Sequence, residues 1–200
     1  MASSTASGSP LFVITGPSGA GKGTLLDALG ERLPDLEAAV SATTRARRPG
    51  EQDGRDYWFL SADEFERRIE NGDFLEHVTY VSGHRYGTLS SELDRIRTAG
   101  HICVLELETD GALAVSEAVP GAVTIFVDAP SFAELERRLR ERSTESTGEI
   151  GERLDLARRQ REQSGHFDHM VVNDDLARAV EEIAGIVSDE LHAVGSMSEP

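Results

Sequence analysis

A glycine-rich run with one lysine is the part of the sequence that could do chemistry most directly. The run comprises Gly16, Pro17, Ser18, Gly19, Ala20, Gly21, Lys22, Gly23 and Thr24. Its glycines allow the backbone to curl, so that successive N–H groups and the start of a following helix point at phosphate oxygens. Lys22 stands where its ammonium group would bridge the outer phosphates of a nucleotide. The spacing therefore predicts a nucleotide phosphate site rather than a structural turn.

Lys22 is also the only lysine among the 20 basic residues of the chain. Lysine is a compact charge on a slim stem, whereas arginine is a wide planar fork, so the single lysine indicates a position that arginine cannot serve. The run departs from the general phosphate-loop pattern at Gly23, where Ser or Thr usually supplies a hydroxyl ligand to Mg²⁺. We therefore assign no direct protein ligand to the metal and expect Mg²⁺ to be held mainly by nucleotide phosphates and water.

A second candidate site is an arginine-rich segment at residues 41–51. Ser41, Arg45 and Arg48 stand there beside further hydroxyls and a Pro-Gly turn. Arginine forks bind phosphate through two parallel hydrogen bonds, so the segment could hold a second phosphate group. Taken alone, it is equally consistent with a basic surface loop.

The elements that must position these residues alternate between strands and helices. Expected strands cover residues 11–15, 102–105, 123–127 and 169–172, with an extended segment at 74–80. Expected helices cover residues 22–33, 61–71, 90–99, 131–142, 150–163 and 176–192, two of them opened by capping boxes. This alternation predicts an α/β fold, a mainly parallel sheet with helices on both faces, whose ligands lie beyond the carboxyl ends of the strands. The polar stretch at 53–92 breaks the alternation and predicts a small inserted lobe.

Composition narrows the class of protein. The chain has 200 residues, 38% of them hydrophobic, which suits one domain with a sizeable core. A net charge of −16 argues against general nucleic-acid or membrane-surface binding, and no apolar run approaches the roughly 18 residues of a membrane span. The single cysteine fits a reducing cytoplasm. Residues 1–10 lack the pattern of a secretory signal, and we expect them and residues 195–200 to be disordered tails.

Several separated motifs, in their order and spacing, resemble those of guanylate kinases. They are the phosphate loop ending in Lys22, Ser41-Ala-Thr-Thr-Arg45 with Arg48-Pro-Gly-Glu51, Asp56-Tyr57, Asp73-Phe-Leu-Glu76, Arg85-Tyr86-Gly87-Thr88 and Val172-Asn173-Asp-Asp175. The resemblance runs from about residue 11 to about residue 188. It implies a P-loop kinase fold with a GMP-binding lobe at about 41–92 and a mobile lid at about 138–153. It also implies transfer of the γ-phosphoryl group of ATP to GMP, with Mg²⁺ as cofactor.

The resemblance further implies a role for each matching position. The catalytic cations would be Lys22, Arg45, Arg142 and Arg153. Arg138 and Asn173 would join the phosphate loop in binding ATP. The GMP-binding residues would be Ser41, Arg45, Arg48, Tyr57, Glu76, Tyr86, Gly87, Thr88 and Glu108, of which Glu76, Thr88 and Glu108 would read the base. Glu106 would hold a metal-bound water.

Some positions depart from the family's pattern. Glu106 and Glu108 stand where aspartates are usual, and alternation along a strand would point both the same way. Residues 140–145 lack two glycines that are usual in the lid, and we expect residues 143–149 to be mobile. Two alternatives stay open: a related P-loop kinase for another small phosphorylated acceptor, and a non-catalytic interaction module. Glu76, Thr88 and the Arg45/Arg48 pair argue against the first, and the intact phosphate loop argues against the second.

Overall fold

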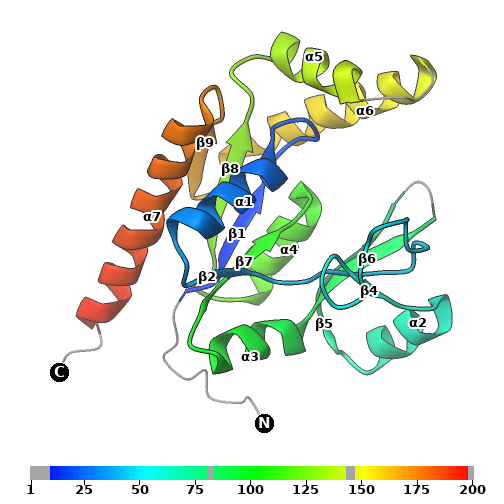
Figure 1. Ribbon diagram of the computed structural model, residues 1–200, viewed down its shortest axis with the longest axis vertical. Coiled ribbons are helices and arrows are strands. Elements are labelled where there is room, and N and C mark those ends of the chain that lie inside the picture. Colours follow the sequence, from blue (N-terminus) through cyan, green and yellow to red (C-terminus); the bar gives the residue numbers. More distant parts are fainter. Residues whose placement is uncertain (1–9, 81–82, 143–146, 198–200) are drawn as a thin grey trace.

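The computed structural model describes residues 10–80, 83–142 and 147–197 as an α/β fold with two sheets (Figure 1). The strands are β1 (Phe12–Thr15), β2 (Leu36–Ala38), β3 (Ala42–Thr43), β4 (Trp58–Phe59), β5 (Phe74–Thr79), β6 (Arg85–Leu89), β7 (Ile102–Glu106), β8 (Val123–Asp128) and β9 (His169–Val172). The helices are α1 (Lys22–Arg32), α2 (Ala62–Glu70), α3 (Ser90–Thr98), α4 (Thr109–Ala118), α5 (Phe132–Arg142), α6 (Thr147–Glu162), the 3-10 helix η1 (Ser164–His166) and α7 (Leu176–Met197).

The larger sheet is parallel throughout and has the order β2-β7-β1-β8-β9. Its central strand β1 is apolar on both faces, as a sheet covered on both sides requires. Phe12 and Ile14 belong to the core cluster that includes residues of α1 and α7, whereas Val13 belongs to the cluster that includes residues of α3 and α4. Successive side chains of a strand point to opposite faces, so this partition places helices on both sides of the sheet and confirms the predicted architecture.

The carboxyl ends of the central strands lie together at one edge of the parallel sheet. The phosphate loop follows β1, Glu106 ends the neighbouring strand β7, and Asp128 ends β8 on the other side. The chain builds outward from β1 first toward β2 and β7 and then toward β8 and β9, so the strand order reverses at β1. Ligands of open α/β sheets bind at such a switch point, which is where the sequence puts its glycines and Lys22.

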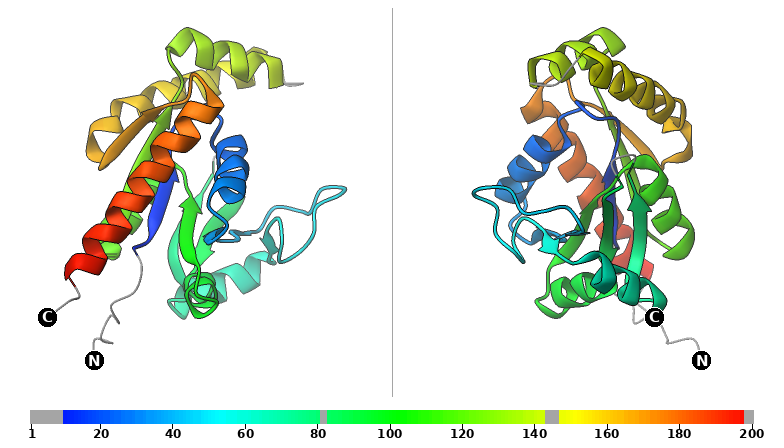
Figure 2. Two further views of the ribbon diagram at one scale, coloured as in Figure 1. Left: turned by 60° about the vertical axis from the view of Figure 1, so that its left-hand side comes forward. Right: turned by 90° about the vertical axis from the view of Figure 1, so that its right-hand side faces the viewer.

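The smaller sheet has the order β4-β3-β6-β5 and combines one parallel with two antiparallel pairings. Figure 2 shows it with α2 to one side of the parallel sheet, while α5 and α6 lie across one end of that sheet. A small apolar cluster holds the smaller unit together: Phe65 is fully buried and stacks on Phe74 with ring centroids 4.4 Å apart. The stretch that broke the strand–helix alternation therefore forms an element group with its own core, as expected.

Two expected element boundaries are wrong. Helix α6 begins at Thr147 and not at residue 150, so three residues of the expected mobile stretch are helical. Helix α7 continues to Met197, so residues 195–197 of the expected tail are helical. Extending an existing helix costs much less than starting one, and no proline stops either helix at the expected point. The remaining predictions of disordered tails and of a mobile stretch concern residues 1–9, 143–146 and 198–200, which lie outside the described part of the chain. No helix in the described part of the chain is long and apolar enough to cross a membrane.

Candidate active site

The phosphate loop has the backbone conformation that its glycines allow. Gly16 and Gly21 have φ angles of +139° and +92°, in the region that favours glycine. A Cβ atom at Gly16 would overlap the carbonyl group of Val127, and one at Gly21 would lie 2.6 Å from Nδ2 of Asn173. The Asn173 amide donates to the Ala20 carbonyl oxygen at 2.8 Å. The loop is therefore held between β8 and the residue that follows β9, with no room for larger residues.

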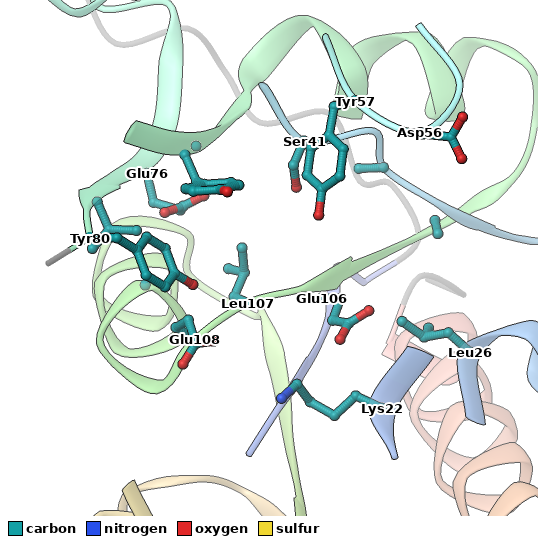
Figure 3. Close-up of a pocket in the computed structure, with 16 residues that line it drawn as sticks. Lys22, Leu26, Ser41, Asp56, Tyr57, Glu76, Tyr80, Glu106, Leu107 and Glu108 are labelled. Atoms are coloured by element: carbon teal, nitrogen blue, oxygen red, sulfur yellow. The ribbon is translucent and has the colours of Figure 1, made fainter. Parts of the chain in front are cut away.

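Lys22 opens helix α1 and turns its side chain back toward the loop. Its Nζ donates to the Gly16 carbonyl oxygen at 2.7 Å. The same side chain lines a cavity opposite Glu106 (Figure 3). Glu106 is exposed where it lines the cavity, yet the protein around it raises its pKa above the ordinary value, while Lys22 acts in the opposite direction. The Lys22 ammonium group therefore lies where the phosphate loop meets the cavity.

Arg138 places a second cation at the phosphate loop from helix α5. Its Nη2 donates to the Asn173 carbonyl oxygen at 3.1 Å, and its Nε donates to Glu134 at 2.8 Å. Together with Gly21 and Thr24 it lines an open hollow of about 330 Å³ beside the loop. The residues expected to bind ATP are in this way brought together.

Of the other two expected lid cations, only Arg153 has a side chain that the structure describes. Arg142 is the last residue of α5, and its side chain is not among those described. Arg153 is half-buried on α6 and lies outside the described walls of both cavities. The position of the lid arginines during catalysis therefore stays a prediction.

A cavity of about 390 Å³ lies between the two sheets, and most of the expected GMP-binding residues line it. They are Ser41, Tyr57, Glu76, Tyr86, Gly87 and Glu108, together with Lys22 and Glu106. Figure 3 shows the side chains of Glu76, from strand β5, and Tyr57, which precedes strand β4, across the cavity from Lys22 and Glu106. The cavity therefore joins the end of the phosphate loop to the smaller sheet.

Glu76 is the buried carboxylate at the far end of this cavity. Only 7% of its surface is exposed, and burial raises its pKa although a hydrogen bond from Thr88 acts to lower it. Thr88 Oγ1 donates to Glu76 Oε1 at 3.0 Å from the paired strand β6. Gly111 leaves room on the other side, since a Cβ there would lie 3.1 Å from Glu76 Oε2. The carboxylate is therefore fixed from one side and approachable from the cavity.

The expected phosphate-binding arginines differ in their placement. Arg45 is half-buried and lies over Tyr57, with Cζ 5.3 Å from the ring centroid. Tyr86 lies beside Tyr57, with ring centroids 6.0 Å apart. Burial raises the pKa of Tyr57, so its hydroxyl stays a hydrogen-bond donor at neutral pH. Arg48 is exposed. Neither arginine is among the residues that line the cavity, and Thr88 is not either, so these three expected GMP-binding residues lie outside its wall.

Sequence reasoning missed Tyr80 as a cavity residue. Glu76, Val78 and Tyr80 all line the cavity from β5 and the residue after it. They are spaced by two, so alternation along the extended segment was a signal that could have identified Tyr80 from Glu76. Burial raises the pKa of Tyr80, and the charge of Glu108, which its hydroxyl faces in Figure 3, raises it further. Gly111 and Leu107 also line the cavity and carried no comparable signal.

Glu106 and Glu108 both line the cavity, as alternation along the extended chain predicts. Strand β7 ends at Glu106, but the Leu107 N–H still donates to the Ile14 carbonyl oxygen at 3.0 Å, and the backbone stays extended at Glu108, the N-cap residue of α4. The turn into α4 carries Glu108 to the side of Tyr80 (Figure 3). The two carboxylates therefore serve opposite ends of the cavity, Glu106 at Lys22 and Glu108 at Tyr80.

The residues near Lys22 fit Mg²⁺ held through a nucleotide. The described residues contain no group of three or more His, Cys, Asp or Glu that could hold a metal ion alone. A Cβ at Gly23 would lie 4.0 Å from Glu106 Oε2, so Glu106 faces the position that lacks the usual hydroxyl. Mg²⁺ commonly keeps several waters and binds one or two carboxylates plus substrate phosphates. One carboxylate, Glu106, beside a loop that would hold nucleotide phosphates matches this coordination.

Comparison with known proteins agrees with the geometry. The model of the family described as guanylate kinase matches residues 8–190. The guanylate kinases of Rubrobacter xylanophilus and Gloeobacter violaceus are 49% and 46% identical to this chain, covering 88% and 92% of it and 92% and 89% of those proteins.

Solved structures extend the comparison to the fold. The crystal structure of guanylate kinase from Anaplasma phagocytophilum matches with a TM-score of 0.74 at 30% identity, covering 93% of this chain and 88% of that one. A gluconokinase from Sinorhizobium meliloti matches with a TM-score of 0.50 at 16% identity, over 96% and 98% of the two chains, and shows the fold alone. Family model, relatives and geometry converge, and the chain belongs to the guanylate kinase family.

Proposed function

We propose that this chain transfers the γ-phosphoryl group of ATP to GMP, giving ADP and GDP, with the phosphate loop holding ATP and the cavity holding GMP. One observation carries the proposal. A single cavity joins Lys22, at the end of the phosphate loop, to the buried carboxylate Glu76 in the smaller sheet. A nucleotide bound there would have its base against Glu76 and its phosphate toward the phosphate loop.

Glu76 suits a guanine base. Guanine presents two donors on one edge, the ring N1–H and the exocyclic amino group, and a carboxylate presents two acceptors at matching spacing. Thr88 has a single hydroxyl hydrogen and donates it to Glu76, so in this arrangement it acts on the base through that carboxylate. Adenine would present an acceptor to the carboxylate, which would then keep only the hydrogen bond from Thr88, and this disfavours AMP.

The positive groups would act on the phosphates. Phosphoryl transfer leaves a protein little covalent chemistry, and the rate comes from holding donor and acceptor in line and neutralising charge on the moving group. Lys22 would contact the transferring phosphoryl group, Arg45 with Tyr57 and Tyr86 would hold the GMP phosphate, and Arg138 with Asn173 would hold ATP. When bound, Mg²⁺ would supply further neutralisation of the phosphate charge, with Glu106 holding one of its waters.

The lid would complete the site. Residues of about 138–153, including Arg142 and Arg153, would close over the transferring group and exclude water. The GMP-binding lobe would correspond to about residues 41–92. We expect the protein to be cytoplasmic, where ATP and GMP are available in solution.

Release of ADP, measured with a panel of nucleoside monophosphates, tests the proposal. We expect rapid release with GMP, slower release with dGMP, and release with AMP, CMP and UMP at the level of the reaction without acceptor. Equal turnover with another small phosphorylated acceptor would favour a related P-loop kinase. An absence of ADP release with every acceptor, from a protein that binds GMP, would favour a non-catalytic module.

A further inference from the structure

The amide of Gln160, on helix α6, lies directly behind the wall of the cavity. Gln160 is 3% exposed, and its Nε2 donates to Oε2 of Glu108. Glu108 lines the cavity, whereas Gln160 lies behind it. No role for Gln160 follows from the sequence motifs, because it stands within an arginine-rich helical stretch that reads as a solvated face.

Glu108 also has a polar neighbour from the smaller sheet. Tyr80 follows strand β5, and its hydroxyl faces the same carboxylate (Figure 3). Glu108 itself is the N-cap residue of α4 in the parallel-sheet unit. Three parts of the fold, the smaller sheet, helix α4 and helix α6, therefore meet at one side chain that faces the cavity.

The buried Gln160 amide makes only part of the hydrogen bonds that it made to water, so its burial destabilises the fold. Gln160 Oε1 is buried and finds no hydrogen-bond partner among the described residues. An unmet buried acceptor destabilises a protein, so a purely structural site would be better filled by an apolar side chain of the same size. The arrangement is consistent with selection for the one hydrogen bond that Gln160 does make, the one to Glu108.

A glutamate that lines a cavity binds its ligand more tightly when a hydrogen-bond partner fixes its side chain beforehand. Its side chain has several rotamers, and a base-reading carboxylate must be held in one of them before the base arrives. Gln160 and Tyr80 restrict the Glu108 side chain before a ligand binds. A glutamate without such neighbours would lose its rotamer freedom only on binding, and that loss would reduce the affinity. The benefit appears as affinity for the group that Glu108 contacts.

We propose that Gln160 is a positioning residue for guanine recognition, which holds Glu108 toward the base and ties the base site to helix α6. This inference rests on the proposed function, in which Glu108 contacts the base. Since α6 also carries Arg153 of the expected lid, the same hydrogen bond connects the choice of nucleotide to the helix pair above the phosphate loop.

Replacement of Gln160 by methionine tests the inference, because methionine keeps the length of the side chain and removes the donor. We expect the Kd and KM for GMP to rise about tenfold, the scale of one lost hydrogen bond to a charged group. We expect the KM for ATP to stay within about twofold, and the preference for GMP over AMP to fall, because AMP does not use the positioned carboxylate. GMP affinity is measured by calorimetry without ATP and turnover by ADP release.

Gln163→Met is the matched control. Gln163 lies three residues further along, and its amide donates to Asp110 at 3.2 Å on the exposed surface. It should change neither the GMP constants nor the GMP-to-AMP preference. Equal changes in the constants for GMP and ATP, or an unchanged GMP-to-AMP preference in Gln160→Met, would overturn the positioning role and leave a structural one.

Gln160→Glu keeps the inference testable should Gln160→Met fold poorly, because it keeps the shape of the side chain and places an acceptor where the donor faced Glu108, so GMP affinity should fall in the same way. Tyr80→Phe, which removes the other hydroxyl donor near Glu108, allows a double-variant test. Both donors act on Glu108, so the loss of GMP affinity in the double variant should differ from the product of the two single losses. Strictly independent losses would contradict a shared target. Failure of the inference is distinguishable from failure of the proposed function, because wild-type protein that phosphorylates GMP with Gln160→Met unchanged would overturn the inference alone.

Discussion

The Arg45 guanidinium and the Glu51 carboxylate form a two-pronged ion pair, with Nη2–Oε1 at 2.7 Å and Nη1–Oε2 at 3.1 Å. Glu51 also accepts from the backbone N–H of Arg48 at 2.7 Å, so it closes the turn that carries both arginines. The pair lowers the pKa of Glu51 and keeps its carboxylate charged. Arg45 Nη1 also donates to the Ala46 carbonyl oxygen at 2.8 Å. Three of the five guanidinium donors are thereby used, and two remain available for a phosphate.

Replacement of Glu51 by Gln should weaken GMP binding. The variant keeps the shape of the side chain and loses the charge that orients Arg45, so we expect the KM for GMP to rise roughly three- to tenfold with little change in the KM for ATP. Glu66→Gln is the control, because Glu66 forms an exposed ion pair with Arg85 in the same unit. A KM for GMP that falls in Glu51→Gln would show that Glu51 competes with the phosphate.

Replacement of Lys22 by Met should lower kcat by at least about 100-fold, the scale of losing one well-placed contact to the transition state. The ammonium group stands between the loop and the cavity, where charge moves during transfer. Arg32→Met, at the other end of α1, removes an exposed cation and should leave kcat unchanged. Circular dichroism and thermal unfolding check the fold of both variants, and near-normal turnover of Lys22→Met would remove the residue from the mechanism.

Replacement of Glu76 by Gln should reduce discrimination between bases. An amide donor would face one of the guanine donors, which should cost GMP binding about 1–3 kcal/mol from the unmet bond. AMP should lose less, so the ratio of kcat/KM for GMP to that for AMP should fall. Thr88→Val, which removes the hydroxyl that holds Glu76, should shift the ratio in the same direction by a smaller amount. An unchanged ratio in Glu76→Gln would place this residue outside the base site.

The pH dependence of GMP binding gives a separate test of Glu76. Burial raises the pKa of this carboxyl, so its ionised form is lost at a higher pH than for an exposed glutamate as the solution is acidified. We expect the KM for GMP to rise as pH falls through that raised value. Stability should respond in the opposite sense, because a raised native pKa favours the folded state at low pH and disfavours it as pH rises. Glu76→Gln should therefore raise the unfolding temperature of the ligand-free protein near pH 8.

Replacement of Glu92 by Gln should destabilise the fold at neutral pH. Glu92 is 3% exposed and accepts from the Val40 N–H at 3.0 Å, from Trp58 Nε1 at 3.2 Å and from Arg95. Burial opposes ionisation, but the hydrogen bonds, chiefly that from Arg95, outweigh it and lower the pKa. Because Arg95 is 46% exposed, solvent weakens the pair, and we expect a loss of about 1–3 kcal/mol.

The loss in Glu92→Gln should depend on pH. A lowered native pKa contributes stability above the ordinary pKa of glutamate, and that stability is lost as pH falls through the lowered value. The difference between wild type and variant should therefore shrink in acid, as measured by urea unfolding. Glu181→Gln, which breaks the exposed pair with Arg32, serves as control and should change stability little at any pH. A pH-independent loss in Glu92→Gln would contradict the role of its charge.

The order of the long elements could be predicted because each is encoded locally. The capping boxes at Ser61 and Ser131 predicted helix starts, and each Ser Oγ accepts from the N–H three residues on, at 3.1 Å. Strands β2, β3 and β4 escaped prediction because they contain three, two and two residues. A strand that short has no measurable periodicity, and its existence depends on a partner elsewhere in the chain. Helix α4 escaped for a different reason, since Gly111 near its start weakens the helical pattern.

The sequence by itself determined the phosphate loop, Lys22 and the parallel sheet, because glycine conformation and apolar alternation act over a few neighbouring residues. It also determined, through motif order, that Glu76 and Tyr86 belong to one site. Only the tertiary structure decided that Arg45 is held by Glu51 and turned over Tyr57, that Thr88 donates to Glu76, and that Gln160 reaches Glu108 across 52 positions of the chain. Such contacts depend on how separate elements dock, and docking follows from the burial of whole faces, which no local run of residues records.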